Sequence, residues 1–227
     1  MIYSKILLGV IFICGGVFTY ATLKKDLRLV RIVQPFVTIL IIVIAALALL
    51  TPGHHLLYIQ LVMLGLIFSL AGDCYMIDIH NNVTFLQGVF FYWAGLIVYS
   101  VIFTWLTGFK LWELGVFALL IIVSAITTAI FFWKGMGKLK VPIIIYAITW
   151  CYLLSQTLTI FWSGGDFFSS TQKWLIAGGT ALYFISDLTL SFHKFNEKYI
   201  PKTYWLGPLI YWAGQTLIAL NCSHAGS

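Results

Sequence analysis

The sequence predicts an all-α, polytopic membrane protein with eight transmembrane helices. Of its 227 residues, 61% are hydrophobic and only 9% are charged, and the mean hydropathy is +0.99. A soluble domain carries far more charge than this. The apolar segments are each close to the ~20 residues needed to cross the hydrocarbon core of a bilayer, and they leave no room for a separate water-soluble domain. We therefore expect residues 1–227 to form a single transmembrane domain.

Polar and turn-forming residues separate the apolar segments and set the limits of each span. We expect the spans, in chain order, at about 3–22, 33–51, 56–76, 83–106, 111–133, 140–163, 172–193 and 203–221. Pro35 opens the second span and Pro142 the sixth, where a helix tolerates proline best. We interpret the first segment as a membrane anchor rather than a cleaved signal peptide, because it has no clear small-x-small site and a basic run follows it.

The net charge of +6 is distributed unevenly along the chain. With eight spans, ten of the thirteen basic residues fall on one side of the membrane: Lys24, Lys25, Arg28, Arg31, Lys134, Lys138, Lys140, Lys194, Lys198 and Lys202. The other side holds Lys5, Lys110 and Lys173. The positive-inside rule then predicts a multi-pass protein of the cell inner membrane with both termini outside the cytoplasm. Topology and contact with lipid headgroups account for these charges, and we expect no nucleic-acid partner.

The cysteines and histidines form no recognisable metal or redox motif. The four cysteines are scattered through the spans without a C-x-x-C pair, and no H-E-x-x-H spacing occurs. A G-x-S-x-G serine nucleophile motif is absent as well. We therefore expect no metal and no cofactor.

A short repeated motif indicates an internal duplication. Tyr92-Trp93-Ala94-Gly95 in the fourth span recurs as Tyr211-Trp212-Ala213-Gly214 in the eighth, and an aspartate precedes each copy. Spans one to four and five to eight would then be copies, with boundaries at about 1–107 and 108–221. Each copy has an even number of spans, so both would have the same orientation, as in a parallel repeat.

The two aspartates that precede these motifs, Asp73 and Asp187, lie inside apolar spans, whereas the other five acidic residues fall in polar connections or at span ends. A carboxylate within a bilayer is costly and usually faces a functional cavity. By residue count, both lie ~23–26 Å from the outer edge of their spans. This matching depth predicts a paired-carboxylate site that opens to the cytoplasm or the inner leaflet.

Polar side chains near the two aspartates are candidates to bind a substrate. Residues three or four positions apart share a face of a helix, which places Ser69 beside Asp73 and Tyr183 beside Asp187. The candidate set is Ser69, Tyr146, Tyr183, Ser186, Tyr211 and Gln215. Packing and interhelical hydrogen bonding are the alternative roles for such residues.

A close carboxyl pair in an apolar pocket tends to share a proton. One group can then act as a general acid and the other as a general base. This arrangement suits hydrolysis through a protonated intermediate, and it predicts that Asp73 and Asp187 are the catalytic residues.

Several motifs resemble those of the YhhN family, the lysoplasmalogenases, over nearly the whole chain. They are Arg31–Pro35, Ser69–Asp73, Phe85–Gly88, Ser186-Asp187 with Leu190, and Gln215 with Leu217-Ile218. The resemblance implies a hydrolase of ether bonds, which releases a fatty aldehyde from the vinyl ether of lysoplasmenylethanolamine or lysoplasmenylcholine, with Asp73 and Asp187 as catalytic residues. Its implied partners are a lysophospholipid substrate and the surrounding membrane lipid.

Other functions fit some of these features. A carboxylate-driven transporter of a small or lipid-like solute would also use intramembrane acids and a parallel repeat, but it needs a path open to both sides. Gly72-Asp73 is similar to one element of the intramembrane aspartyl proteases, although their Tyr-Asp and Pro-Ala-Leu elements are missing. A non-enzymatic lipid-binding or scaffold protein is the remaining alternative. The sequence does not specify the oligomeric state.

Overall fold

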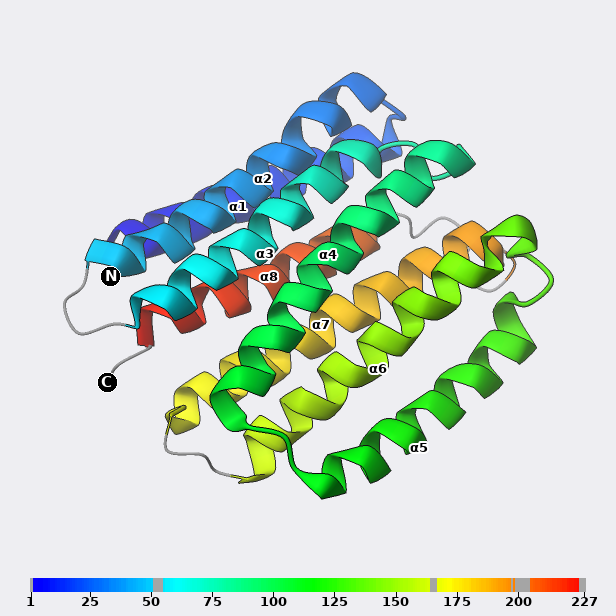
Figure 1. Cartoon of the computed structure of the whole chain (residues 1–227). Coiled ribbons are helices and arrows are strands. Elements are labelled where there is room, and N and C mark those ends of the chain that lie inside the picture. The colour runs from blue at the N-terminus through cyan, green and yellow to red at the C-terminus, as the bar shows by residue number, and fades with distance from the viewer. Residues whose placement is uncertain (1, 51–54, 164–166, 197, 199–204, 225–227) are drawn as a thin grey trace.

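All regular structure in this computed structural model is helical, which confirms the predicted all-α class. The structure describes residues 2–50, 55–163, 167–196, 198 and 205–224. Figure 1 shows the eight long helices of these ranges: α1 (Ile2–Leu23), α2 (Leu27–Leu47), α3 (Leu56–Tyr75), α4 (Asn82–Thr107), α5 (Leu111–Thr127), α6 (Lys140–Ser163), α7 (Ser170–Phe195) and α8 (Leu206–Asn221).

Helix length and composition support a polytopic membrane protein. Seven of the described helices, α1 to α7, are long and apolar enough to cross a membrane. The eighth predicted span, 203–221, corresponds to α8, which has 16 residues. Residues 203 and 204 of that predicted span lie outside the described ranges.

The second helix begins earlier than the sequence pattern predicts. It starts at Leu27 rather than near residue 33, because the side chain of Asp26 caps it by accepting hydrogen bonds from the backbone N–H groups of Arg28 (3.1 Å) and Leu29 (3.2 Å). Such a cap satisfies backbone donors that the first helical turn leaves free. Pro35 therefore lies inside α2 and does not open it, whereas Pro142 does lie in the first turn of α6.

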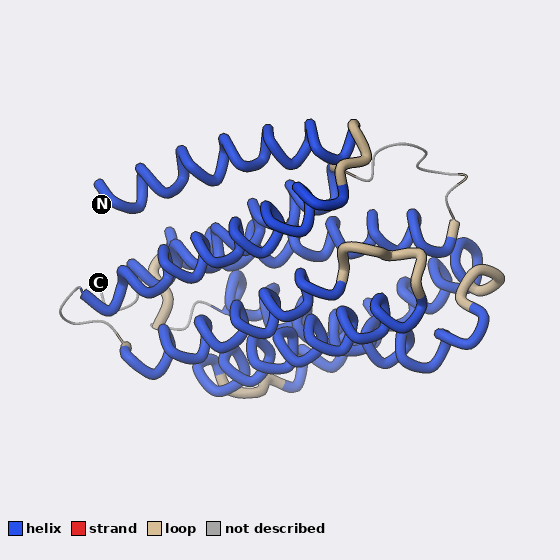
Figure 2. Tube along the Cα trace, turned by 90° about the horizontal axis from the view of Figure 1, so that it is seen from above, coloured by secondary structure: helices blue, strands red, loops and turns tan. Residues whose placement is uncertain are grey.

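Helix packing follows the same scheme in the two halves of the chain. In the first half α1 packs on α2, α2 on α3 and α3 on α4; in the second half α5 packs on α6, α6 on α7 and α7 on α8. The two most extensive contacts between the halves are those of α4 with α6 and of α8 with α2, which are also equivalent under the predicted duplication. In Figure 2, α1 lies at the edge of the bundle. These matched contacts support the predicted 4+4 repeat, whose superposition stays a prediction.

Glycines allow the last two helices of each half to approach closely. A Cβ atom on Gly214 of α8 would lie 2.7 Å from the carbonyl oxygen of Gly179 of α7, and one on Gly95 of α4 would lie 3.1 Å from that of Gly65 of α3. Gly65 and Gly179 each precede the intramembrane aspartate of their helix by eight residues. The small-residue contact therefore holds the two aspartates at equivalent positions along their helices.

Replacing Gly214 by alanine is expected to destabilise the protein. The added methyl group would meet backbone rather than a flexible side chain, so α7 and α8 must separate, and overpacking of this kind costs ~1–3 kcal/mol. The thermal unfolding temperature of the detergent-solubilised protein should fall. Gly9→Ala is the matched control, because its Cβ would have nothing within 4 Å. Equal unfolding temperatures for the two variants would contradict this account of the α7–α8 contact.

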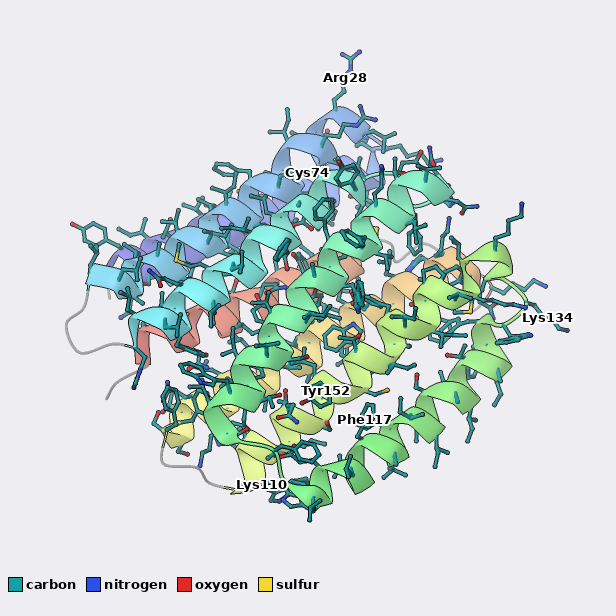
Figure 3. The ribbon with its side chains drawn as sticks, viewed as in Figure 1. Arg28, Cys74, Lys110, Phe117, Lys134 and Tyr152 are labelled. Carbon is teal, nitrogen blue, oxygen red and sulfur yellow. The ribbon has the colours of Figure 1, made fainter. Side chains whose placement is uncertain are left out.

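The basic residues gather at one end of the bundle. Figure 3 shows Arg28 and Lys134 at the end where α1 joins α2 and α5 joins α6, and Lys110 at the opposite end. At the same basic end, Lys194 Nζ donates hydrogen bonds to the carbonyl oxygen of Ile79 (2.6 Å) and to Asn82 Oδ1 (2.7 Å), which tie α7 to the α3–α4 connection.

This distribution of charge predicts that the basic end faces the cytoplasm and that both termini lie outside it. A reporter domain fused at Ser227, of a kind that is active only outside the cytoplasm, should therefore be active. A reporter located in the cytoplasm would show the opposite orientation, in which the site is reached from the other side of the membrane.

One acidic residue outside the predicted pair is buried, although it lies at a span end, where the sequence places it. Glu113, in the first turn of α5, is 1% exposed, and its Oε2 atom accepts a hydrogen bond from Gln156 Nε2 of α6 at 2.8 Å. The partner lies 43 residues away in the chain, so local sequence gives no sign of the contact. The pair attaches the start of α5 to α6.

Candidate functional site

Asp73, two residues before the end of α3, has no exposed surface and accepts four hydrogen bonds. Its Oδ1 atom accepts from Gln34 Nε2 (3.3 Å) and from the hydroxyl of Tyr92 (2.6 Å). Its Oδ2 atom accepts from the hydroxyls of Thr38 and Tyr211, the second at 3.4 Å. Four donors match the roughly four acceptor positions of an ionised carboxylate. All four are neutral groups.

The local sequence of three helices places these donors. Gln34 and Thr38 are four residues apart on α2, so they lie on the same face of that helix. Tyr92 reaches Asp73 because the neighbouring residue on α3 is Gly72, on which a Cβ atom would lie 2.5 Å from the tyrosine ring. Gly72 thus makes room for the ring that donates to Asp73.

Asp187 on α7 has a different environment. It is 9% exposed, and its Oδ2 atom accepts hydrogen bonds from the hydroxyl of Tyr146 and from Trp150 Nε1 (2.8 Å). These donors are again four residues apart, here on α6, the helix that corresponds to α2 in the other half. Within the described residues, Oδ1 of Asp187 accepts no hydrogen bond. One oxygen of this carboxyl group is therefore held in place while the other stays available.

Asp187 borders two neighbouring spaces of contrasting character. The first, which we name the polar pocket, has a volume of ≈ 40 Å³ and lies between α2, α4, α7 and α8. Its polar lining consists of Gln34, Tyr92, Ser186, Asp187, Thr189, His193 and Tyr211. One water needs ~10–15 Å³ by this kind of measure. The polar pocket is therefore large enough for water or for a small polar group.

The second space, which we name the apolar cavity, has a volume of ≈ 270 Å³ and lies between α5, α6 and α7. Its walls are mostly aliphatic and aromatic side chains, including Leu120, Val123, Leu154 and Phe184. Its size is close to the lower end of the ~300–1,000 Å³ range of small-molecule sites. Since Asp187 lies on both linings, its carboxyl group stands where the polar and the apolar space meet.

An aromatic cluster separates the two aspartates. Tyr92 and Tyr211, which donate to Asp73, also line the polar pocket. The ring of Tyr183 lies between them and Trp150, with centroid distances of 5.3 Å to Tyr211 and 4.9 Å to Trp150. The carboxyl groups do not hydrogen-bond to each other. Asp73 therefore lies behind the tyrosines of the pocket that Asp187 lines directly.

The other predicted substrate-binding residues fall into two groups. Tyr146, Ser186 and Tyr211 line one or both spaces beside Asp187, although the Ser186 hydroxyl also donates to the carbonyl oxygen of Gly207 at 2.8 Å. Ser69 and Gln215 lie deeper and bond to each other, with Gln215 Nε2 donating to Ser69 Oγ at 3.2 Å.

Gln215 also accepts from the hydroxyl of Tyr99 at 3.1 Å, so this trio joins α3, α4 and α8. Ser69 and Gln215 are not among the residues that line the polar pocket or the apolar cavity, nor is Tyr183, whose ring packs between the aspartates.

Six residues with polar side-chain atoms that bond to the aspartates or line the polar pocket were not among the sequence candidates: Gln34, Thr38, Tyr92, Trp150, Thr189 and His193. The sequence pattern does point to two of these residues. Thr38 lies one turn after Gln34 in an otherwise apolar helix, and Tyr92 belongs to the repeated motif whose second copy contains Tyr211. No sequence pattern points to Trp150, because tryptophan is enriched at membrane–water interfaces whether or not it has a role in a site.

Clusters of metal-ligating side chains are absent from the part of the chain that the structure describes, where no three His, Cys, Asp or Glu residues come together.

Comparison with known proteins identifies the family. The model of the YhhN family matches residues 5–222, which is nearly the whole chain. The chain belongs to the YhhN family. No curated protein matches the chain, and no solved structure does. Both aspartates and both spaces beside Asp187 lie within the part that the YhhN model matches.

Proposed function

We propose that this protein hydrolyses the vinyl ether bond of a lysoplasmalogen, a single-chain phospholipid. The observation that carries the proposal is the position of Asp187, whose carboxyl group has one free oxygen and stands between the polar pocket and the apolar cavity. In a lysoplasmalogen the vinyl ether joins the hydrocarbon chain to the polar glycerol headgroup. A substrate with its chain in the apolar cavity and the glycerol oxygen next to the vinyl ether at the polar pocket would present that bond to Asp187.

The chemistry of vinyl ethers suits a carboxylic acid. A proton adds to the β-carbon of the double bond and leaves an oxocarbenium ion; water then attacks the cationic carbon and loses a proton. The resulting hemiacetal breaks down to a fatty aldehyde and the free hydroxyl of the glycerophospho headgroup. One water is consumed and the catalytic proton is returned. Protonation at carbon is slow at neutral pH, so a positioned acid is the group the reaction most needs.

The two aspartates would have different roles. Asp187 would deliver the proton from Oδ1, while Tyr146 and Trp150 hold its other oxygen in place. Asp73, which has four neutral donors, would remain a carboxylate and stabilise the oxocarbenium ion electrostatically. It would act on the attacking water through the hydroxyl of Tyr211, which faces the polar pocket.

The direct test uses purified protein and lysoplasmenylethanolamine in detergent or vesicles, with aldehyde release as the readout. We expect one aldehyde for each substrate consumed. The matched control is the 1-O-alkyl lysophospholipid of equal chain length, which lacks the double bond and should remain intact. The proposal is falsified if the vinyl ether substrate also remains intact while the protein is folded and inserted.

A carboxylate-driven transporter remains the alternative, because it too would place acids inside the membrane. Transport requires a path that opens to both sides, whereas the polar pocket extends from Asp187 toward His193 and Gly207, at the basic end of the bundle. Proton-coupled uptake by protein-containing vesicles, without aldehyde release, would favour transport over hydrolysis.

A further inference from the structure

We infer that the apolar cavity binds one hydrocarbon chain of a single-chain amphiphile, with the methyl end of the chain between Leu120 and Leu154. This inference rests on the proposed function and adds where the chain lies and which residues limit its length. It concerns binding, so it can be tested without any chemical step.

The dimensions of the cavity fit one chain from one leaflet. Its wall on α6 runs from Ile143 to Leu154, which is about 16 Å at ~1.5 Å per residue. That is about half of the ~30 Å hydrocarbon core of a bilayer, and about 12 Å of it lies beyond Tyr146, the hydrogen-bond partner of Asp187. The volume of ≈ 270 Å³ is contained between three helices.

The distribution of polar groups gives the chain a direction. Asp187 accepts hydrogen bonds from Tyr146 and Trp150 and so lies part-way along the cavity, which continues toward the basic end past Ser191 to Phe132 and Phe195. Cys151, Leu154 and Leu120 line the other end. The polar pocket also extends from Asp187 toward the basic end. A headgroup on the polar-pocket side, toward the basic end, therefore leaves the opposite end of the cavity, near Leu120 and Leu154, for the end of the chain.

The way α5 is attached gives the chain an entry route from the bilayer. At its start α5 is fixed to α6 by Glu113 and Gln156. Beyond its last α-helical turn it continues as a π-helical turn, Thr128–Phe132, in which Phe132 packs on Phe192 of α7 with ring centroids 4.8 Å apart. Between these attachments the cavity separates the middle of α5 from α7. π-helical turns often occur at functional sites.

Photo-crosslinking tests the inference. The probe is lysophosphatidylethanolamine with a saturated ester-linked chain that carries a diazirine at its methyl end, in vesicles of phosphatidylethanolamine and phosphatidylglycerol. Adducts are mapped by mass spectrometry. We expect them on the lining residues Leu120, Val123, Cys151 and Leu154, and we expect unlabelled lysophosphatidylethanolamine to compete with the probe. Adducts confined to the outward residues Ile122 and Ile126, without competition, would mean ordinary labelling by the bilayer and would overturn the inference.

Variants at the far end of the cavity sharpen the test. Cys151→Phe, and Leu120→Trp from the opposite wall, should lower adduct yield with a long-chain probe by about tenfold, the effect of losing burial of about two methylene groups. A shorter-chain probe should be affected less. Ile145→Phe is the matched control, because Ile145 is on the same helix but 45% exposed.

Unchanged labelling in both far-end variants, with folding verified by size-exclusion chromatography, would also overturn the inference. The probe has no vinyl ether, so chain binding without aldehyde release would contradict only the proposed reaction. If the protein releases aldehyde but the far-end variants leave probe labelling unchanged, only the proposed position of the chain is contradicted.

Discussion

Replacing Asp187 by asparagine is expected to lower the rate of aldehyde release by on the order of 10²-fold or more, the usual loss when a general acid is removed. Asparagine keeps the size of the side chain, and its amide oxygen can still accept from Tyr146 and Trp150 on the side where Oδ2 lies. The amide nitrogen would then take the position of Oδ1 and could not supply a proton to carbon. The loss should fall on kcat, because the walls of both spaces remain in place.

The matched control for this change is Asp78→Asn. Asp78 is an exposed residue of the α3–α4 connection, and its Oδ1 accepts a hydrogen bond from the backbone N–H of His80. The side-chain oxygen of an asparagine can accept the same hydrogen bond. Asp166 and Glu197, two other acidic residues of the connections, lie outside the described residues. Aldehyde release from folded Asp187→Asn at the rate of Asp78→Asn would remove Asp187 from the reaction.

Replacing Asp73 by asparagine should also remove most activity, by about 10²-fold, with a smaller effect on stability. The hydrogen-bond arrangement explains why the variant can fold. Gln34 Nε2 can only donate, and it needs an oxygen at the Oδ1 position. Thr38 and Tyr211, at the Oδ2 position, are hydroxyls that can turn and accept from an amide nitrogen. The variant thus loses the negative charge and keeps the contacts.

The double variant distinguishes a shared site from two separate ones. If Asp73 and Asp187 serve one reaction, Asp73→Asn combined with Asp187→Asn should cost little more than the worse single change, because residues that act as a unit are not additive. If instead the fold loss of the double variant equals the product of the two single losses, the two aspartates contribute independently. Thermal unfolding of all three variants, measured in parallel, separates loss of catalysis from loss of fold.

The sequence predicts the helices well and singles out the two intramembrane aspartates because both depend on local signals. Apolar runs of the right length specify the spans, and an acid such as Asp73 inside such a run is conspicuous. The start of α2 was missed because one capping residue, Asp26, extends the helix into a stretch that contains Arg28 and Arg31. A cap acts through two hydrogen bonds and leaves no trace in a hydropathy pattern.

Features that depend on contacts between distant residues could not be predicted. Glu113 is buried because Gln156 is opposite to it on another helix, and Trp150 reaches Asp187 because α6 and α7 are adjacent. The apolar cavity arises from the sizes and angles of side chains on three helices. The separation of the aspartates by Tyr92, Tyr183 and Tyr211 likewise follows from packing, so equal depth in the membrane did not predict it.

The four donors that surround Asp73 are an amide and three hydroxyls, so this carboxylate has no resident counter-ion. A carboxylate arranged in this way would attract a positive charge in the neighbouring polar pocket, and the oxocarbenium ion of the proposed reaction would carry that charge only briefly. A stable cation of the same shape would carry it permanently. A single-chain amphiphile with an amine in place of the vinyl ether should therefore inhibit the protein more strongly than its neutral ether analogue, and Asp73→Asn should abolish that preference.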